Sequence, residues 1–323
     1  MSVGGKESSA GTRPHQKYEG LIARAKKSAS VVTLVVHPCD ETSLRGAVEA
    51  AQEDLIIPVL VGPRRKIEAV ASAHGMDLSA WEVVDVPHSD AAAAKAVELI
   101  REGRGEVLMK GSLHTDELMR AVTASATGLR TARRISHVFI MDVPSHSETL
   151  FITDAAINIA PDLEAKRDIV QNAIDLFTET GLGTPRVAIL SAVETVTSKI
   201  PSTLDAAALC KMADRGQITG GVLDGPLAFD NAVDPEAAKI KGISSPVAGH
   251  AQILVVPNLE AGNMLAKNLS FLAKADAAGI VLGARVPIVL TSRADAVRTR
   301  LASCAVAVLL ADARRRSTSA EKM

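Results

Sequence analysis

The sequence contains few aromatic residues and no excess of charge of either sign. Aromatic side chains make up only 2% of the 323 residues, with Trp81 and Tyr18 as the single tryptophan and tyrosine. Because single-stranded nucleic acids bind by stacking on aromatic side chains, this mode of binding is excluded. The chain holds 36 Lys and Arg against 37 Asp and Glu, a formal net charge of −1. Such a balance predicts no general attraction to nucleic acid or to a membrane surface.

Cysteines and long apolar runs are scarce as well. Cys39, Cys210 and Cys304 are too few and too widely spaced for a disulfide framework, which is typical of a reducing cytoplasm. No apolar run is long enough to cross a bilayer, and the N-terminal stretch lacks the apolar centre of a signal peptide. We therefore expect a soluble protein of the cytoplasm.

Motifs that bind metals or nucleotides are also missing. The eight histidines form no H-E-x-x-H pattern and no C-x-x-C pair occurs, so we expect no zinc site. There is no G-x-x-x-x-G-K-[ST] loop, and the G-L-G at Gly181 precedes an expected strand instead of following one. Four aspartates can be read as a carboxylate set: Asp142, Asp154, Asp224 and Asp230. Their places at strand ends, in a turn and at a helix start favour turn and capping roles, so we predict no metal.

Apolar residues are plentiful, and they fall into short segments that alternate along the chain. A chain of 323 residues with 47% hydrophobic content exceeds what one core usually organises, so we expect two domains. Strands are predicted at 31–36, 56–61, 81–84, 106–109, 137–141, 149–153, 186–190, 219–223, 253–256, 279–282 and 287–290. Helices are predicted at 18–28, 42–53, 66–74, 90–102, 116–127, 163–180, 201–215, 259–274 and 293–311, and the polar stretch 1–13 is predicted to be disordered. This alternation indicates an α/β fold with a largely parallel sheet.

Polar and glycine residues cluster in residues 220–293, where three of the expected strands end. They are Gly249, His250, Asn258, Gly262, Asn263, Gly283, Arg285, Ser292 and Arg293. In open α/β sheets, ligands bind beyond the carboxyl ends of the strands. We therefore predict that this part of the chain carries a binding site.

A second polar group, Lys110–Thr115, lies between an expected strand and an expected helix. Gly111 permits a tight turn, and Ser112 or Thr115 can cap the helix, whose N-terminus favours an anion. An ordinary capped turn explains the same residues equally well. Arg120 lies about one and a half turns further along the helix, where an arginine is usually a solvated residue.

Thr291–Arg293 also joins an apolar strand to a helix. Ser292 is placed as an N-cap, and capping alone is a sufficient explanation of its position. It lacks the G-x-S-x-G setting of a hydrolase nucleophile, so a covalent acyl-serine is not indicated.

Several long strings resemble the signature region of the phosphate acetyltransferase and phosphate butyryltransferase family. They are LMKGSLHTDELMRAV (108–122), FITDAAINIAPD (151–162), DGPLAFDNA (224–232), SPVAGHAQILVVPNLEAGNMLAK (245–267) and GARVPIVLTSRAD (283–295). The resemblance extends over most of the chain, from about residue 90 to about residue 310. Several strings in the right order make it specific.

The resemblance implies two α/β/α domains with largely parallel sheets, similar to isocitrate and isopropylmalate dehydrogenases, with an active-site cleft between them. In this family the last helix returns to the first domain. The implied domains are 14–145 together with 292–323, and 146–291 as an insertion. The family is commonly dimeric, so a homodimer is also implied.

The implied activity is acyl transfer between coenzyme A and phosphate, in which acyl-CoA plus orthophosphate gives acyl phosphate plus coenzyme A. We expect direct transfer in a ternary complex, with coenzyme A as a substrate and without a cofactor or metal. The acyl group, acetyl or butyryl, stays open, because two methylenes differ by only ~1–3 kcal/mol apiece.

The resemblance also implies roles for individual residues. Family members use the Ser–Arg pair, so Ser292 is expected to donate to the developing oxyanion and Arg293 to hold phosphate. The residues assigned to substrate binding are Lys110, Ser112, His114, Thr115, Arg120, Asn263 and Arg285. Many acetyltransferases carry an acidic residue where Thr299 stands here, a departure closer to the butyryltransferase branch. Asp295 is the only acid close by and is assigned to catalysis, although it can equally favour the helix dipole, and the base stays unassigned.

Two alternatives stay open. A decarboxylating dehydrogenase of related fold needs Mg²⁺ held by closely placed aspartates, which do not cluster in the sequence. A non-catalytic module that binds coenzyme A or another anion is the second, since a fold does not imply an activity.

Overall fold

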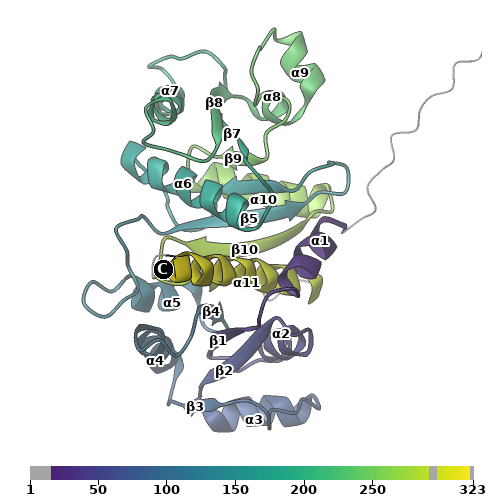
Figure 1. The fold of residues 1–323 in the computed structure, drawn as a ribbon, viewed down its shortest axis with the longest axis vertical. Coiled ribbons are helices and arrows are strands. Elements are labelled where there is room, and N and C mark those ends of the chain that lie inside the picture. Colours follow the sequence, from purple (N-terminus) through teal and green to yellow (C-terminus); the bar gives the residue numbers. More distant parts are fainter. Residues whose placement is uncertain (1–15, 291–296, 321–323) are drawn as a thin grey trace, which may run out of the picture.

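The computed structural model describes residues 16–290 and 297–320, and its strands form one sheet with helices on both faces (Figure 1). The first part of the chain forms α1 (Gln16–Ala25), β1 (Val31–Val36), α2 (Glu41–Gln52), β2 (Ile56–Gly62), α3 (Arg64–Ala73), β3 (Val83–Asp85), α4 (Ser89–Arg101), β4 (Val107–Lys110), α5 (Thr115–Thr123) and β5 (Ser136–Asp142). The second part forms β6 (Leu150–Thr153), α6 (Leu163–Glu179), β7 (Arg186–Leu190), α7 (Pro201–Asp214), β8 (Val222–Leu227), α8 (Phe229–Val233), α9 (Pro235–Ile240), β9 (Ile253–Val255), α10 (Leu259–Leu272), β10 (Asp276–Leu282), β11 (Ile288–Val289) and α11 (Val297–Ala320). The tail predicted to be disordered, residues 1–13, lies outside the described residues.

The eleven strands lie in the order β3-β2-β1-β4-β11-β10-β5-β6-β9-β7-β8. Seven of the ten strand pairs are parallel, so the α/β fold with a mostly parallel sheet is confirmed. The pairs β11–β10, β10–β5 and β5–β6 are antiparallel. These three antiparallel pairs connect the strands of both halves of the chain into one sheet. The family resemblance implied a separate sheet in each domain, and that expectation is wrong. The division into two domains stays a prediction.

The antiparallel pairs also reverse the direction of the strands across the sheet. β1, β2, β3, β4, β11 and β5 point one way, whereas β10, β6, β9, β7 and β8 point the other way. The carboxyl ends of β1, β4 and β11 therefore lie together at one edge of the sheet. The carboxyl ends of β6, β9 and β10 lie at the opposite edge.

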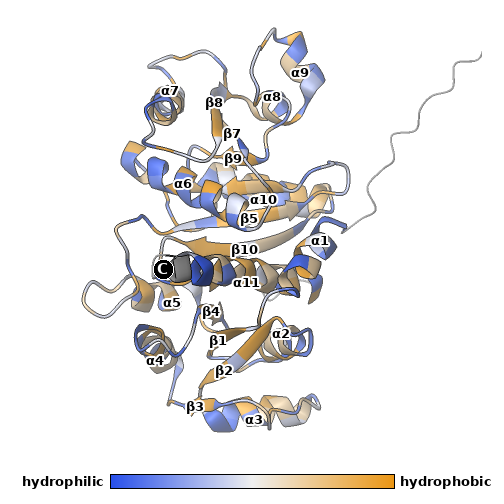
Figure 2. Ribbon diagram, in the orientation of Figure 1, coloured by the Kyte–Doolittle hydropathy of each residue, from blue (hydrophilic) through white to orange (hydrophobic). Residues whose placement is uncertain are grey.

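The strands are apolar along their whole length because both faces of the sheet are covered. Figure 2 shows the strands mainly in orange, while many helices carry blue on the sides turned away from the sheet. One face carries a core that runs through both halves, with residues from α1, α2, α6, α7 and α11. The other face carries two separate clusters, one around Leu108 in the first half and one around Leu254 in the second.

The C-terminal helix closes the fold by packing against α1, α2 and β10. Residues 304–311, CAVAVLLA, are all buried. A helix that is apolar on every side must be buried on every side, which explains its central position (Figure 1). α11 thus lies against helices of the N-terminal half of the chain, and its assignment to a first domain stays a prediction.

Two regions differ from the sequence-based expectation. A strand was expected at 219–223, whereas β8 begins at Val222 and continues to Leu227. It does so although it contains Pro226. β8 is the last strand of the sheet, where a residue without an N–H costs little. For α8 the sequence predicted only a helix start at Asp230, and α9 was not predicted, since five and six residues are too few to show a helical period.

Candidate active site

The predicted group Lys110–Thr115 lies at the edge formed by the carboxyl ends of β1 and β4. The amide groups of Gly111 and Ser112 donate to the carbonyl oxygens of Val36 and His37, both at 2.9 Å. A Cβ on Gly111 would lie 2.3 Å from the oxygen of Val36 and 2.6 Å from that of His37. Only glycine fits this close approach, which draws the ends of the two strands together.

The hydroxyl of Ser112 is engaged by the residues that follow β1. It donates to the carbonyl oxygen of His37 at 2.8 Å, and its oxygen lies 3.0 Å from Nδ1 of that histidine. The backbone N–H of Cys39 also reaches it at 3.3 Å. Ser112 therefore organises the end of β1 and does not cap α5. Burial raises the pKa of the Cys39 thiol to about 11, so this cysteine is no nucleophile at neutral pH.

α5 begins at Thr115 with its first turn directed toward the same edge. His114 is the N-cap residue, and its side chain makes no capping hydrogen bond. Because the first amide groups of a helix lack partners within the helix, they favour a negatively charged ligand. His114 and Thr115 form this N-terminus, and their role in binding substrate stays a prediction.

Lys110 lies beside the carboxyl end of β11. Lys110 ends β4, and the preceding Met109 pairs with Val289 of β11. Lys110 Nζ donates to the carbonyl oxygen of Gly111 at 3.2 Å. The strand register therefore places Leu290, the residue after β11, beside Lys110. The next residues in the sequence carry the predicted catalytic group. The predicted catalytic residues Ser292, Arg293 and Asp295 belong to that stretch and lie outside the described residues, so their roles stay predictions.

Arg120 projects from α5 into solvent. Its side chain is 71% exposed, and its nearest acidic partners are Asp90 at 3.7 Å and Asp116 at 3.8 Å. These loose contacts are what an ordinary solvated arginine makes. Its predicted role in binding phosphate is not tested by them and stays a prediction.

Asn263 and Arg285 lie at the opposite edge of the sheet. Asn263 Nδ2 donates to the carbonyl oxygen of Ala155, just beyond the carboxyl end of β6, at 3.3 Å. Arg285 precedes β11, and its backbone N–H donates to the carbonyl oxygen of Leu129 at 2.9 Å. The structure therefore does not bring these two residues together with Lys110–Thr115.

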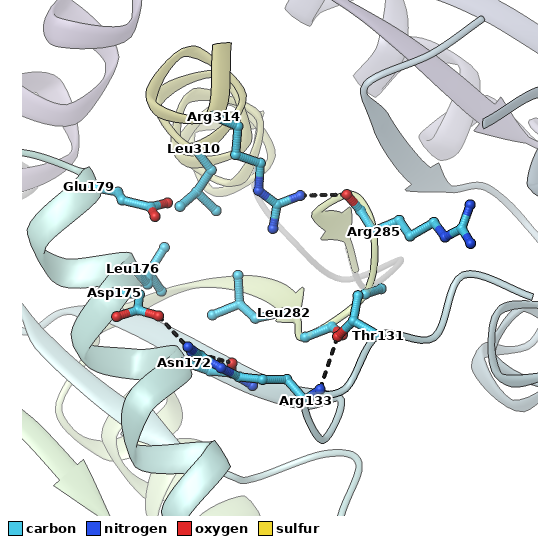
Figure 3. Close-up of a pocket in the computed structure, with 12 residues that line it drawn as sticks. Thr131, Arg133, Asn172, Asp175, Leu176, Glu179, Leu282, Arg285, Leu310 and Arg314 are labelled. Atoms are coloured by element: carbon cyan, nitrogen blue, oxygen red, sulfur yellow. Dashed lines mark hydrogen bonds and ion pairs between the residues drawn. The ribbon is translucent and has the colours of Figure 1, made fainter. Parts of the chain in front are cut away.

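A cavity of about 300 Å³ adjoins Arg285 (Figure 3). The side chain of Arg285 points away from it, whereas Arg314 crosses it and donates to the carbonyl oxygen of Arg285 at 2.8 Å. Arg133 pairs with Asp175 at 2.6 Å, and burial raises the pKa of the nearby Glu179 carboxyl. The charges of this cavity are largely matched within the protein, so it does not compete with the edge at β1, β4 and β11 as a phosphate site.

Comparison with known proteins decides the family. A family model for phosphate acetyl/butaryl transferases matches residues 87–308. A phosphate acetyltransferase of Rhizobium meliloti is 78% identical over 299 residues, which cover 93% of this chain and 95% of that protein. The chain belongs to this family.

Members of the family with other acyl groups are also similar. A phosphate butyryltransferase of Clostridium acetobutylicum is 40% identical over 92% of this chain and 98% of its own. The solved structure of a branched-chain phosphotransacylase from Enterococcus faecalis V583 is 29% identical, with a TM-score of 0.76, and covers 87% of this chain and 99% of that chain. The similarity thus extends over sequence and fold together.

Thr299 stands where the family resemblance implies an acidic residue. This residue lies in the first turn of α11, is 4% exposed, and its carbonyl oxygen accepts from the Ser303 hydroxyl at 3.1 Å. It faces the core, so the position that carries an acid in many acetyltransferases is not available as a base here.

Two histidines, one directly after β1 and one in β5, were not singled out from the sequence. His37 could have been found, because it directly follows an expected strand, where ligands bind. His137 of β5 could not, because it sits inside an apolar run. It is 2% exposed, and a Cβ on Gly279 would lie 2.9 Å from its Nε2 and 3.0 Å from the oxygen of Leu290. His137 and Leu290 therefore both flank Gly279, and burial lowers the pKa of His137 to about 4.

The described residues contain no group of three or more His, Cys, Asp or Glu side chains placed to hold a metal ion. Within the same ranges, none of the helices has an apolar stretch of the length needed to span a membrane.

Proposed function

We propose that this protein is a phosphate acyltransferase, which interconverts acyl-CoA plus orthophosphate with acyl phosphate plus coenzyme A. The observation that carries the proposal is the 78% identity to a phosphate acetyltransferase over 93% of the chain. The edge at β1, β4 and β11 agrees with it, because a lysine and the N-terminus of α5 both favour an anion there.

The preferred acyl group in this proposal is acetyl. Identity to the acetyltransferase is 78%, against 40% to the butyryltransferase. Each methylene of the acyl chain changes binding by only ~1–3 kcal/mol, so butyryl-CoA should react more slowly without being excluded.

In the proposed mechanism, transfer is direct and both substrates are bound at once. Lys110 and Arg293 neutralise phosphate groups, and the N-terminus of α5 at His114 and Thr115 adds backbone donors. Ser292 donates to the oxygen of the thioester as it becomes negative. The proposal does not depend on Arg120, Asn263 or Arg285, whose substrate contacts stay predictions.

The proposal includes a homodimer in the cytoplasm. α10 exposes an apolar stripe, defined as Met264, Phe271 and Leu272, which are 60%, 74% and 80% exposed. Residues seven and eight positions apart lie on one side of a helix, so the stripe is a single surface that a second copy of the chain can cover. The reducing cytoplasm is favoured by the three unpaired cysteines.

The test is an assay for release of coenzyme A thiol from acetyl-CoA and from butyryl-CoA, with and without orthophosphate. We expect thiol release that depends on phosphate, with a higher kcat/KM for acetyl-CoA. Binding of coenzyme A without turnover would instead support a non-catalytic module. The family match disfavours a decarboxylating dehydrogenase, and Mg²⁺-dependent reduction of a nicotinamide cofactor would be needed to revive that alternative.

A further inference from the structure

His37 has an unusual position at the end of β1. Its backbone φ is 56°, in the left-handed region that few residues other than glycine adopt, although histidine is among the more tolerant. Residues held in this way are enriched at functional sites. The turn places the His37 ring beside Ser112, which lies 75 positions further along the chain.

The contacts of Ser112 accommodate a proton on Nδ1 of the His37 ring. The Ser112 hydroxyl lies 2.8 Å from the carbonyl oxygen of His37, to which it donates. The contact of 3.0 Å between Ser112 Oγ and His37 Nδ1 can then carry the proton on Nδ1, which is the tautomer that the role proposed below requires. A neutral imidazole with its proton on Nδ1 keeps a lone pair on Nε2. None of the described residues donates a hydrogen bond to that nitrogen.

The charges around His37 keep the ring neutral. Burial lowers its pKa first, and the ammonium group of Lys66 on α3 lowers it further. Glu117 on α5 and Asp40 before α2 act in the opposite direction without reversing the shift. Because the pKa lies below 6.5, His37 can accept a proton at neutral pH.

His37 also lies beside the predicted binding group Lys110–Thr115, through its contact with Ser112. β4 separates β1 from β11, and adjacent strands lie about 4.8 Å apart, so the ends of β1 and β11 are separated by roughly 10 Å. A sulfur atom held between them can approach the His37 ring on one side and Leu290, the residue after β11, on the other.

We propose that His37 is the base that accepts the thiol proton of coenzyme A, a role that rests on the proposed function. When acyl-CoA forms, His37 Nε2 takes the proton as the sulfur bonds to the acyl carbon. The bond between that carbon and the phosphate oxygen breaks, and its electron pair leaves with the phosphate. In the opposite direction, protonated His37 returns the proton to the leaving thiolate. Ser112 is a positioning residue, since it holds the ring through Nδ1.

The variant His37→Asn tests this role. Asparagine tolerates a positive φ, and its amide can replace the Nδ1–H donor to Ser112, but it has no group at the place of Nε2. We expect kcat/KM to fall about 100-fold or more. In the direction that forms acyl-CoA from acyl phosphate and coenzyme A, the wild-type profile of kcat/KM against pH should fall on the acid side below pH 6.5, where His37 becomes protonated. This acid limb should disappear in His37→Asn.

His74→Asn is the matched control, because His74 is exposed at the far end of α3, and it should keep wild-type kcat/KM and the acid limb. His37→Gly supplies a second test, since glycine accepts the positive φ and leaves room for added imidazole. Partial recovery of its activity with imidazole supports the proposal.

Two results would overturn the role of His37. One is wild-type kcat/KM with an unchanged acid limb in His37→Asn. The other, decisive if His37→Asn does not melt cooperatively, is a folded His37→Gly whose activity does not respond to imidazole. An inactive wild-type protein would instead overturn the proposed function, so the two failures are distinguishable.

Discussion

Gly111 is the residue that allows the ends of β1 and β4 to meet. Gly111→Ala would press a methyl group against backbone oxygens of Val36 and His37, 2.3 and 2.6 Å away, which cannot move without distorting β1. We expect a loss of about 1–3 kcal/mol in the free energy of unfolding, together with loss of activity.

Gly20→Ala is the control, since a Cβ at this position of α1 would meet nothing within 4 Å. There alanine should stabilise the helix by ~0.5–1 kcal/mol. Equal melting temperatures for the two variants would contradict this account.

Substitution of Ser292 and substitution of Arg293 should cause two different kinetic defects. Ser292→Ala removes a donor that acts on the transition state, so kcat should fall ~10²–10³-fold with a small change in KM. Arg293→Ala removes a charge that holds phosphate before and during the reaction, so at least one KM should also rise.

Melting temperature measured on the same Ser292→Ala sample is the control. A pure N-cap would lose ~0.5–2 kcal/mol of stability while the folded protein kept its kcat. That combination would mean that Ser292 caps a helix and has no part in the chemistry.

At the scale of elements, a buried ion pair ties α1 to β5. Lys17 Nζ lies 2.9 Å from Asp142 Oδ1 and donates to the carbonyl oxygen of Val143 at 2.6 Å. The two side chains are only 8% and 2% exposed. Lys17→Met would leave the carboxylate buried and unpaired, which should cost ~3–5 kcal/mol and lower the urea midpoint.

The double variant Lys17→Met/Asp142→Asn removes the unpaired charge and should recover part of that loss. If the double variant is no more stable than Lys17→Met, the ion pair is not the cause of the effect.

Most elements could be predicted because their signals are local. The strand 186–190 is β7 as expected, and the helix 163–180 differs from α6 by one residue. Larger errors arose where a neighbour overrides local preference. β10 begins at Asp276 rather than 279, because its first residues pair with Asp142 and Met141 of β5. That partner lies more than a hundred residues away, beyond the reach of any local pattern.

At the scale of the whole molecule, the apolar stripe on α10 predicts the oligomeric state. We expect the protein to elute as a dimer in size-exclusion chromatography with light scattering. Phe271→Lys places a charge in the stripe and should yield monomers. Ile240→Lys is the control, because Ile240 is 84% exposed on α9 outside the stripe, and should leave the dimer intact. A monomeric wild-type protein would remove the homodimer from the proposal.

Metal dependence is a second property of the whole molecule. The described residues offer no cluster of metal-binding side chains, and the proposed transfer uses charged side chains, hydrogen-bond donors and the His37 base. Activity should therefore survive dialysis against EDTA. Complete loss of thiol release, restored by Mg²⁺ alone, would contradict a reaction without metal.

The family and the kind of chemistry could be read from the sequence, since long strings such as SPVAGHAQILVVPNLEAGNMLAK and the order of elements lie within single stretches of chain. Which residues share a site could not. Lys110 and Arg285 both read as phosphate ligands, yet they lie at opposite edges, because direction along the sheet reverses at β10. His37 gains its neighbour Ser112 only through the parallel pairing of β1 and β4. Strand direction and pairing depend on contacts between distant segments, and local periodicity carries no information about them.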